Sequence, residues 1–267
     1  MKLSEKNIFL QKYGNWAVVT GASSGIGRAL AIELAKIGFD LILVGRNQPS
    51  LAELGQKIEN QYFSQTKIIV ADLSNTGGNQ QVLDKTRDLP VGLLVLSAGF
   101  GTSGLFLQGD MLEESEMIDV NILSPLILSQ AFALRFSERG KGGIIFLSSI
   151  VAFQGVPFAA NYAATKAYIQ TLAEGLQQEL GQNRIDVLAA CPGPVGSGFA
   201  TRAKMVMGKT LTPEEIALPI LSALGKKGTV FPGTLTKILK GALWFLPRWG
   251  KVRVMGMVMG GFTKHRR

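Results

Sequence analysis

Short apolar runs alternate with segments of helical periodicity over most of the chain. Trp16-Ala-Val-Val-Thr20 is followed by a glycine-rich turn and then by apolar residues at helical spacing from Ile26 to Ile37. The alternation continues with apolar runs at 41–44, 67–70, 93–96, 144–147 and 185–189, separated by predicted helices at 51–58, 80–87, 111–120, 122–136 and 161–180. Continuous apolar strands between helices are typical of a parallel sheet covered on both faces. The pattern predicts an α/β fold with a doubly wound Rossmann-type sheet.

Proline and glycine residues after the sixth apolar run predict where the last elements of the fold begin and end. Pro192 and Gly193 end that strand, Pro213 opens a helix running to Leu224, and Thr229-Val-Phe231 is a short seventh strand. We expect one domain at 1–235, extended by a basic, partly amphipathic segment at 236–267. Residues 1–14 have no apolar signal core and are expected to be an exposed lead-in.

Composition narrows the class of protein. With 267 residues, 46% of them hydrophobic, the chain can bury one large core. The single cysteine, Cys191, excludes an intrachain disulfide, and the single histidine, His265, leaves no Cys/His cluster for a metal. We therefore expect a reducing, cytoplasmic location and no metal. No run of about 18 uninterrupted apolar residues predicts a transmembrane helix.

The glycine-rich turn Thr20-Gly-Ala-Ser-Ser-Gly-Ile-Gly27 lies between a predicted strand and a predicted helix. This is the context of a dinucleotide-binding loop. Gly21, Gly25 and Gly27 let the backbone turn tightly and approach a pyrophosphate, which the amides of the helix N-terminus stabilise. Glycines alone are a weak signal, and a merely structural turn is the alternative.

Tyr162-Ala-Ala-Thr-Lys166 places a phenol and an ammonium on the same face of a helix. A nearby Lys and an oxidised nicotinamide favour the phenolate and bring the pKa of the tyrosine toward a useful range for proton transfer. By itself this spacing is usually a solvated pair. Ser148 and Ser149 lie at the carboxyl end of the fifth strand, where open α/β sheets bind ligands. A Ser149 hydroxyl there could donate to a carbonyl oxygen, whereas Ser148 is better explained as capping a turn.

In order and spacing, Thr20-Gly-x-x-x-Gly-x-Gly27, Asn121, Ser149, Tyr162 and Lys166 resemble the short-chain dehydrogenase/reductase family over about residues 14–235. The resemblance implies hydride transfer between a nicotinamide and an alcohol or carbonyl, with Tyr162 as the acid/base. It also implies that Lys166 binds the nicotinamide ribose and that Asn121 holds a water that passes protons to solvent. Further cofactor contacts implied are Ser23, Ser24, Ile26, Asp72, Leu73, Ala98, Gly99, Pro192, Gly193, Val195 and Ser197. Ser97 stands where the family usually has Asn.

Cofactor choice depends on the end of the second strand, where an acidic residue would accept the ribose hydroxyls of NAD. Gly45 occupies that place and Arg46 follows. A guanidinium can form bidentate contacts with a 2′-phosphate, so NADP(H) is favoured over NAD. The alternative is that Arg46 is a solvated charge that caps a helix.

The segment between Val195 and Pro213 contains Phe199 and Met205 with few charges, which favours a hydrophobic substrate. The resemblance implies a homo-oligomer, a dimer or tetramer, packed through the helices at 122–136 and 161–180. The competing function is a catalytically silent nucleotide-binding protein, or a membrane-associated regulatory protein, on the same fold.

The net charge of +9 is concentrated at the end of the chain. Ten of the 28 Lys and Arg residues lie between residues 226 and 267, where there is no Asp or Glu. Trp244, Trp249 and apolar residues are mixed with Lys237 and Lys240, which suits a helix that lies on an anionic membrane surface. This would make the protein a peripheral membrane protein at the inner face of a membrane. The alternative is that this apolar face closes the substrate pocket or a subunit contact. No nucleic-acid recognition motif accompanies the charge, so no nucleic-acid partner is expected.

Overall fold

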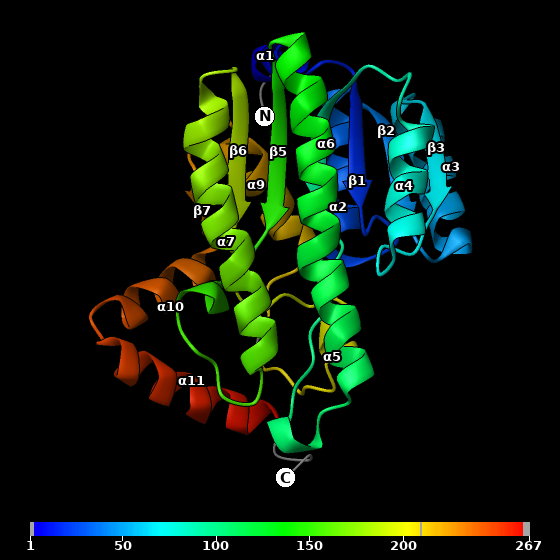
Figure 1. Cartoon of the computed structure of the whole chain (residues 1–267). Helices are drawn as coiled ribbons and strands as arrows, with labels where there is room; N and C mark the ends of the chain where they lie inside the picture. The colour runs from blue at the N-terminus through cyan, green and yellow to red at the C-terminus, as the bar shows by residue number, and fades with distance from the viewer. Residues whose placement is uncertain (1–2, 209, 264–267) are drawn as a thin grey trace.

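A seven-stranded parallel sheet forms the centre of the molecule (Figure 1). The computed structural model describes residues 3–208 and 210–263. The strands run in the order β3-β2-β1-β4-β5-β6-β7. Their bounds are β1 Trp16–Thr20, β2 Asp40–Gly45, β3 Thr66–Val70, β4 Val91–Leu96, β5 Gly142–Leu147, β6 Ile185–Ala190 and β7 Thr229–Val230. The predicted doubly wound sheet is confirmed, and the strand order reverses between β1 and β4.

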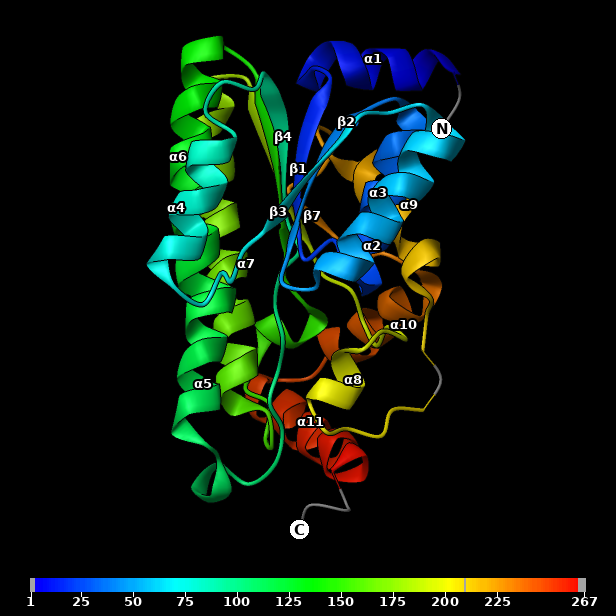
Figure 2. The ribbon, with the colours of Figure 1, turned by 90° about the vertical axis from the view of Figure 1, so that its right-hand side faces the viewer.

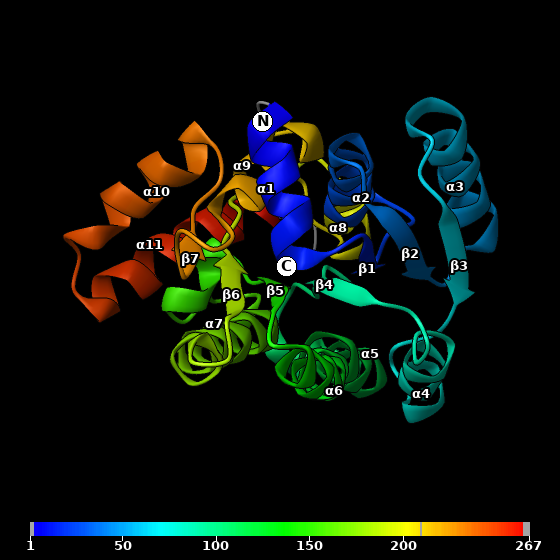
Figure 3. The same ribbon diagram turned by 90° about the horizontal axis from the view of Figure 1, so that it is seen from above.

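Helices cover both faces of the sheet (Figure 3). One face packs against α1 (Leu3–Tyr13), α2 (Gly25–Ile37), α3 (Gln48–Tyr62) and α9 (Pro213–Ala223), and the other against α4 (Thr76–Lys85), α6 (Ser124–Arg139) and α7 (Ala160–Gly181). Alternate strand residues serve the two cores: Val19 and Leu43 face the first, Val18 and Ile42 the second. Burial on both faces explains why the strands appear in the sequence as continuous apolar runs.

The expectation that residues 1–14 are an exposed lead-in is wrong, because α1 closes one end of the first core. Phe9 is 7% exposed and Tyr13 1% exposed. The Phe9 ring lies edge-on to Tyr13 and to Phe39, with centroids 4.7 and 5.9 Å apart. The Tyr13 hydroxyl donates a 2.6 Å hydrogen bond to Asp186 at the start of β6. Two large side chains thus fix a helix whose remaining positions are mostly polar.

The helices predicted at 111–120 and 122–136 are one continuous rod. α5 (Met111–Ile118) passes through a π-helical turn, η2 (Asp119–Leu123), into α6. Among the described residues this rod is the one helix that is long and apolar enough to cross a membrane. Part of its apolar character is explained by packing, since Leu128, Phe132 and Phe136 are fully buried against the sheet. Other apolar residues of the rod, among them Leu112 and Leu134, are exposed.

The chain after β7 folds into two helices, α10 (Thr234–Trp244) and α11 (Arg248–Phe262), joined by a tight turn. In Figures 1 and 2 they lie at the end of the molecule to which the strands point. Met259 of α11 is buried with Val156, Ala159 and Ala163. Residues 264–267, including His265, lie outside the described residues, and the boundary expected at residue 235 stays a prediction.

Candidate active site

The site residues expected from the sequence gather where β1, β4 and β5 end. A parallel sheet brings the carboxyl ends of its strands to one edge, and the reversal of strand order between β1 and β4 separates the loops there. Figure 2 shows this edge facing α8 (Phe199–Arg202), α10 and α11.

The glycine-rich turn after β1 is held against the end of β4. Gly21 and Gly25 have φ values of +68° and +54°, which favour glycine. A Cβ on Gly27 would overlap the Gly21 carbonyl oxygen, so helix α2 starts in close contact with the turn. The Thr20 hydroxyl accepts 3.1 Å hydrogen bonds from the amides of Ser97 and Ala98. This tight backbone at a helix N-terminus fits a dinucleotide pyrophosphate.

The residues expected at the adenosine end lie together after β2 and β3. The Ser23 hydroxyl lies 3.4 Å from the position of a Cβ on Gly45. Asp72 accepts hydrogen bonds of 3.0 and 2.9 Å from the amide and hydroxyl of Ser74. Burial raises the pKa of Asp72, but these bonds and the charge of Arg46 outweigh it, so the pKa lies below its usual value. The Asp72 carboxyl therefore stays ionised near neutral pH.

Arg46 is paired within the chain. Its guanidinium lies 2.9 Å from a carboxylate oxygen of Glu116 on α5 and 4.0 Å from Asp72. The same oxygen of Glu116 also accepts a 3.1 Å hydrogen bond from Arg202 on α8. Glu116 could not be predicted from the sequence, because it lies 70 residues from Arg46 and belongs to no motif. One carboxylate thus joins the end of β2 to the segment over the site.

The loop expected beside the carboxamide closes the cofactor side of the site. The Pro192 carbonyl accepts from the Ile150 amide at 3.0 Å, and the Gly193 amide donates to Thr236 of α10 at 3.0 Å. Buried Val195 precedes Ser197, whose Cβ lies 3.1 Å from the position of a Cβ on Gly25. The glycine-rich turn and this loop therefore approach each other.

Ser149, Tyr162 and Lys166 meet between β5 and α7. Ser149 and Lys166 are buried, at 8% and 7% exposed, and Tyr162 is half-buried. The Ser149 hydroxyl acts on the Tyr162 phenol, whose pKa it lowers in part. The Lys166 ammonium donates to the Leu147 carbonyl at 2.8 Å and lies 5.8 Å from the centroid of the Tyr162 ring. Ser148 instead donates to the Lys166 carbonyl, which is a structural contact.

Asn121 lies within the π-helical turn, and such turns often mark functional sites. Its side-chain amide donates to the Phe100 carbonyl at 2.8 Å and to Thr165 at 3.0 Å, and its oxygen accepts from the Phe100 amide. A Cβ on Gly99 would lie 2.8 Å from this oxygen and 3.4 Å from the Lys166 ammonium. Asn121 and Lys166 therefore converge on Gly99, and a water held by Asn121 stays a prediction.

Burial sets the protonation of the pair in the protein alone. It raises the pKa of Tyr162 to about 12, although the hydrogen bond with Ser149 lowers it in part. Burial also lowers the pKa of Lys166 to about 8. Near neutral pH the phenol therefore keeps its proton while the ammonium is still mostly charged. The phenol is thus in the form that can donate to a carbonyl oxygen.

Phe199 of α8 covers the catalytic tyrosine candidate. Its ring centroid lies 5.1 Å from that of Tyr162. Gly101 leaves room for this contact, because a Cβ there would lie 2.7 Å from Phe199 and 3.0 Å from Tyr162. The guanidinium of Arg202 lies 3.7 Å from the centroid of the Phe100 ring. Phe100 and Gly101 could not be predicted from the sequence, because their roles depend on contacts between distant segments.

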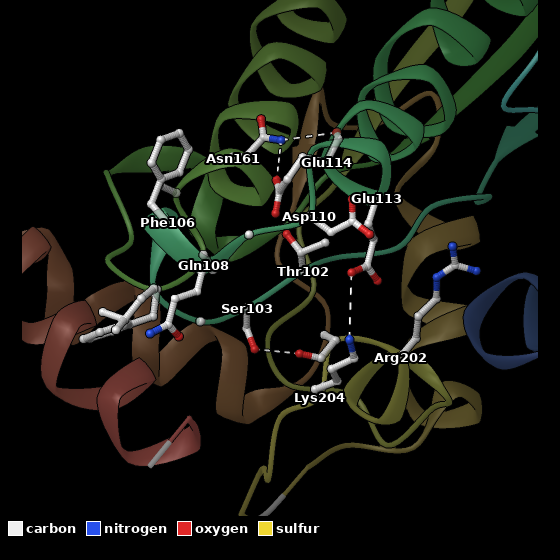
Figure 4. A pocket seen from close by; sticks show the side chains of 17 residues that line it. Thr102, Ser103, Phe106, Gln108, Asp110, Glu113, Glu114, Asn161, Arg202 and Lys204 are labelled. Atoms are coloured by element: carbon white, nitrogen blue, oxygen red, sulfur yellow. Dashed lines mark hydrogen bonds and ion pairs between the residues drawn. The ribbon is translucent and has the colours of Figure 1, made fainter. Parts of the chain in front are cut away.

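A pocket of about 250 Å³ opens beside Asn161, the residue before Tyr162 (Figure 4). Asn161 donates a 2.6 Å hydrogen bond to Glu114. Lys204 pairs with Glu113 at 4.0 Å. The lining is largely polar, with Thr102, Ser103, Gln108, Asp110, Glu113, Glu114, Asn161, Arg202 and Lys204 in it. Tyr162 also packs against a buried apolar cluster of Val156, Ala159, Ala163 and Met259. Val151, Phe158, Met205, Met255 and Phe262 pack against the same cluster. Over residues 3–208 and 210–263, no group of three or more His, Cys, Asp or Glu could hold a metal.

Comparison with known proteins agrees with this geometry. The family model of short chain dehydrogenases matches residues 15–205. A 7beta-hydroxysteroid dehydrogenase of Clostridium sardiniense is 32% identical over 86% of this chain and 89% of its own length. A solved structure of a 7beta-hydroxysteroid dehydrogenase has a TM-score of 0.84 at 26% identity, covering 92% of this chain and 98% of that one.

A short-chain dehydrogenase from Sphingobium yanoikuyae, solved in complex with NADPH, has a TM-score of 0.79 at 27% identity and covers 88% of this chain and 97% of that one. The fold and the family match agree. This protein is an oxidoreductase that belongs to the short-chain dehydrogenase family.

Proposed function

We propose that the protein transfers a hydride between NADP(H) and the carbonyl or secondary alcohol of a bulky, largely apolar substrate. The observation that carries this proposal is the meeting of Ser149, Tyr162 and Lys166 between β5 and α7, with the Lys166 ammonium 5.8 Å from the centroid of the Tyr162 ring. Burial shifts the pKa values of the Lys166 ammonium and the Tyr162 phenol. Shifted pKa values of this kind are concentrated at functional sites.

Each residue of the group has a distinct role in carbonyl reduction. Bound NADPH supplies the hydride. Tyr162 donates the proton to the carbonyl oxygen, and Ser149 donates a hydrogen bond to the charge developing there. Lys166 supplies positive charge beside the phenol and a donor for the ribose, and Asn121 supports proton return to Lys166. In the reverse direction Tyr162 accepts the proton of the alcohol.

NADP(H) is favoured because Gly45 leaves no carboxylate at the end of β2 and Arg46 follows it. Tight contact between Gly27 and Gly21 supports a pyrophosphate on the N-terminus of α2. An NADPH complex of a relative with the same fold is consistent with this preference. We place the enzyme in the cytoplasm, since its single cysteine, Cys191, is buried and reduced.

Two features support the substrate class. Tyr162 packs against two apolar clusters and the Phe199 ring, which favours an apolar substrate next to the reacting carbon. The pocket in Figure 4 lies further out and offers hydrogen-bonding and charged groups to a polar end of the same molecule. The relative named as a 7beta-hydroxysteroid dehydrogenase fits this kind of substrate.

Assembly into a dimer or tetramer is part of the proposal. The outer face of α7 presents a groove lined by Ala167, Tyr168, Thr171, Leu172, Gly175, Leu176 and Glu179. On the adjacent α6, Leu134 is 65% exposed. A second copy packing on these helices would cover both features.

The test is NADPH oxidation with a panel of bulky ketones by wild type and by Tyr162→Phe. The variant removes only the hydroxyl, so turnover is expected to fall by roughly 10²–10⁴ while NADPH binding is retained. Tyr62→Phe, at the end of α3 and away from both the site and the proposed subunit contact, is the matched control and should keep full activity. Retained turnover in Tyr162→Phe would refute the assignment. NADPH binding without turnover in wild type on every ketone would favour the catalytically silent alternative.

A further inference from the structure

We propose that the turn between α10 and α11 docks the protein on an anionic membrane surface. The hairpin, defined as residues 234–262, projects beyond α7 in Figure 1 and lies far from α3 in Figure 3. Its two ends are fixed to the body. Thr236 is buried and accepts from the Gly193 amide, and the Phe262 carbonyl accepts from the Val206 amide. The turn between the two helices therefore lies outside the body of the fold.

Large apolar side chains are exposed at this turn. Phe245 is 89% exposed, Trp249 71%, Trp244 68% and Ile238 63%. Three of them are aromatic and lie within six residues of sequence. Trp is enriched where an apolar phase meets water, because its ring is apolar and its N–H is polar. The part of the chain that the structure describes does not cover these rings, so they are available to an external apolar phase.

The charge of the hairpin identifies that phase. Lys237, Lys240, Arg248 and Arg253 are exposed, and the segment from residue 226 to the end has no Asp or Glu. Among the described residues, no ion pair involves a basic residue of the hairpin. A second copy docking through this surface would oppose like charges. An anionic bilayer offers negative headgroups and an apolar interior together, which matches both parts of the hairpin.

The docked hairpin would connect the membrane with the active site, a consequence that rests on the proposed function. α11 runs from Trp249 at the exposed turn to Met255 and Met259, which pack in the apolar cluster that includes Tyr162. The short helical turn η1 (Phe106–Gln108) lies at the same end of the molecule (Figures 1 and 2), and its Phe106 and Leu107 are exposed. A substrate dissolved in the bilayer would therefore approach along an apolar route.

The experiment is sedimentation of the full chain with phosphatidylcholine vesicles, with and without phosphatidylserine, at low and physiological salt. Wild type is expected to bind the anionic vesicles, more weakly at higher salt, and to bind neutral vesicles at least about tenfold less. Three variants are compared: Trp244→Ser/Phe245→Ser/Trp249→Ser, Lys237→Gln/Lys240→Gln/Arg248→Gln, and the control Lys57→Gln/Phe63→Ser. The control removes an exposed cation and an exposed aromatic ring near α3, at the opposite edge of the sheet.

The charge variant is expected to lower the vesicle partition coefficient about 100-fold, and the aromatic variant at least about tenfold. The control should match wild type. In a Trp16→Phe background the two hairpin tryptophans are the only ones left, and their emission should shift to the blue on binding. Equal binding by wild type and both hairpin variants would overturn the proposal.

Two further measurements separate the alternatives. If light scattering shows that the aromatic variant loses an oligomeric state which wild type has, the hairpin contacts a second copy and the proposal is overturned. Tyr162→Phe should bind vesicles like wild type, and the hairpin variants should keep NADPH oxidation with a water-soluble ketone. Membrane docking and the catalytic assignment can therefore fail independently.

Discussion

Replacing Lys166 by Met is expected to make the protein more stable at pH 7 while removing most of its activity. The ammonium is 7% exposed, and burial lowers its pKa from 10.5 to about 8. Within the part of the chain that the structure describes, the ammonium donates one hydrogen bond, of 2.8 Å, to the Leu147 carbonyl. A charge kept in such a place costs folding free energy, and an enzyme retains it for its chemistry.

The pH window and the magnitude follow from the two pKa values. Below about pH 8 the lysine is protonated in both the folded and the unfolded chain, so the cost of the buried charge is fully present. From pH 8 to 10.5 the folded protein releases the proton while the unfolded chain keeps it, so stability rises with pH. The difference between the two pKa values corresponds to about 3 kcal/mol.

Urea unfolding of wild type and Lys166→Met at steps from pH 7 to 10.5 measures this difference directly. The stability advantage of the variant is expected to shrink by about 3 kcal/mol across that range. Burial also raises the pKa values of Tyr162 and Cys191 to about 12, above this range. The Lys166 charge lowers the pKa of Cys191, so its removal keeps the thiol protonated, and both unfolded chains ionise alike at these two residues. Parallel stability curves would refute the reasoning, because they would show that the ammonium is solvated or paired.

Three other changes test separate parts of the site and assembly. Arg46→Asp is expected to reverse the ratio of kcat/KM values for NADPH and NADH toward NADH, and a wild type that already prefers NADH would contradict the proposal. Gly27→Ala should lower both Tm and NADPH affinity, because its Cβ overlaps the Gly21 carbonyl, whereas Gly181→Ala, with no atom within 4 Å, should leave NADPH affinity unchanged. Light scattering should give a dimer or tetramer, and Leu134→Asp should shift it toward monomer. A wild-type monomer at micromolar concentration would contradict the proposed assembly.

The sheet and the gathering of the site were predictable because both depend on local sequence. Continuous apolar runs identify strands buried on two faces, and parallel topology then brings all their carboxyl ends to one edge. Ser149 follows β5 directly, and Tyr162 and Lys166 are one helical turn apart on α7. Their meeting required no knowledge of long-range side-chain contacts.

The parts that sequence reasoning missed depend on contacts between distant segments. The burial of α1 rests on Phe9 and Tyr13, and the partner of Tyr13 is Asp186, 173 residues away. The two helices predicted on either side of residue 121 are one rod, because the π-helical turn continues the helix while placing Asn121 inward. Neither feature has a periodic pattern strong enough to be seen in the sequence.

Glu116 changes how the proposed cofactor preference has to be explained. Arg46, the expected ligand of a 2′-phosphate, already donates to Glu116, and the same oxygen holds Arg202 of the segment that covers Tyr162. The Glu116 carboxylate and the 2′-phosphate of the proposed cofactor therefore compete for one guanidinium. Selectivity for the phosphate depends on the difference between their two binding free energies. The carboxylate carries one charge and the phosphate up to two, so the phosphate is favoured, but by less than an unpaired arginine would give. A phosphate that draws Arg46 away would leave this Glu116 oxygen to Arg202 alone, so α8 would keep its ion pair with α5 when the cofactor binds.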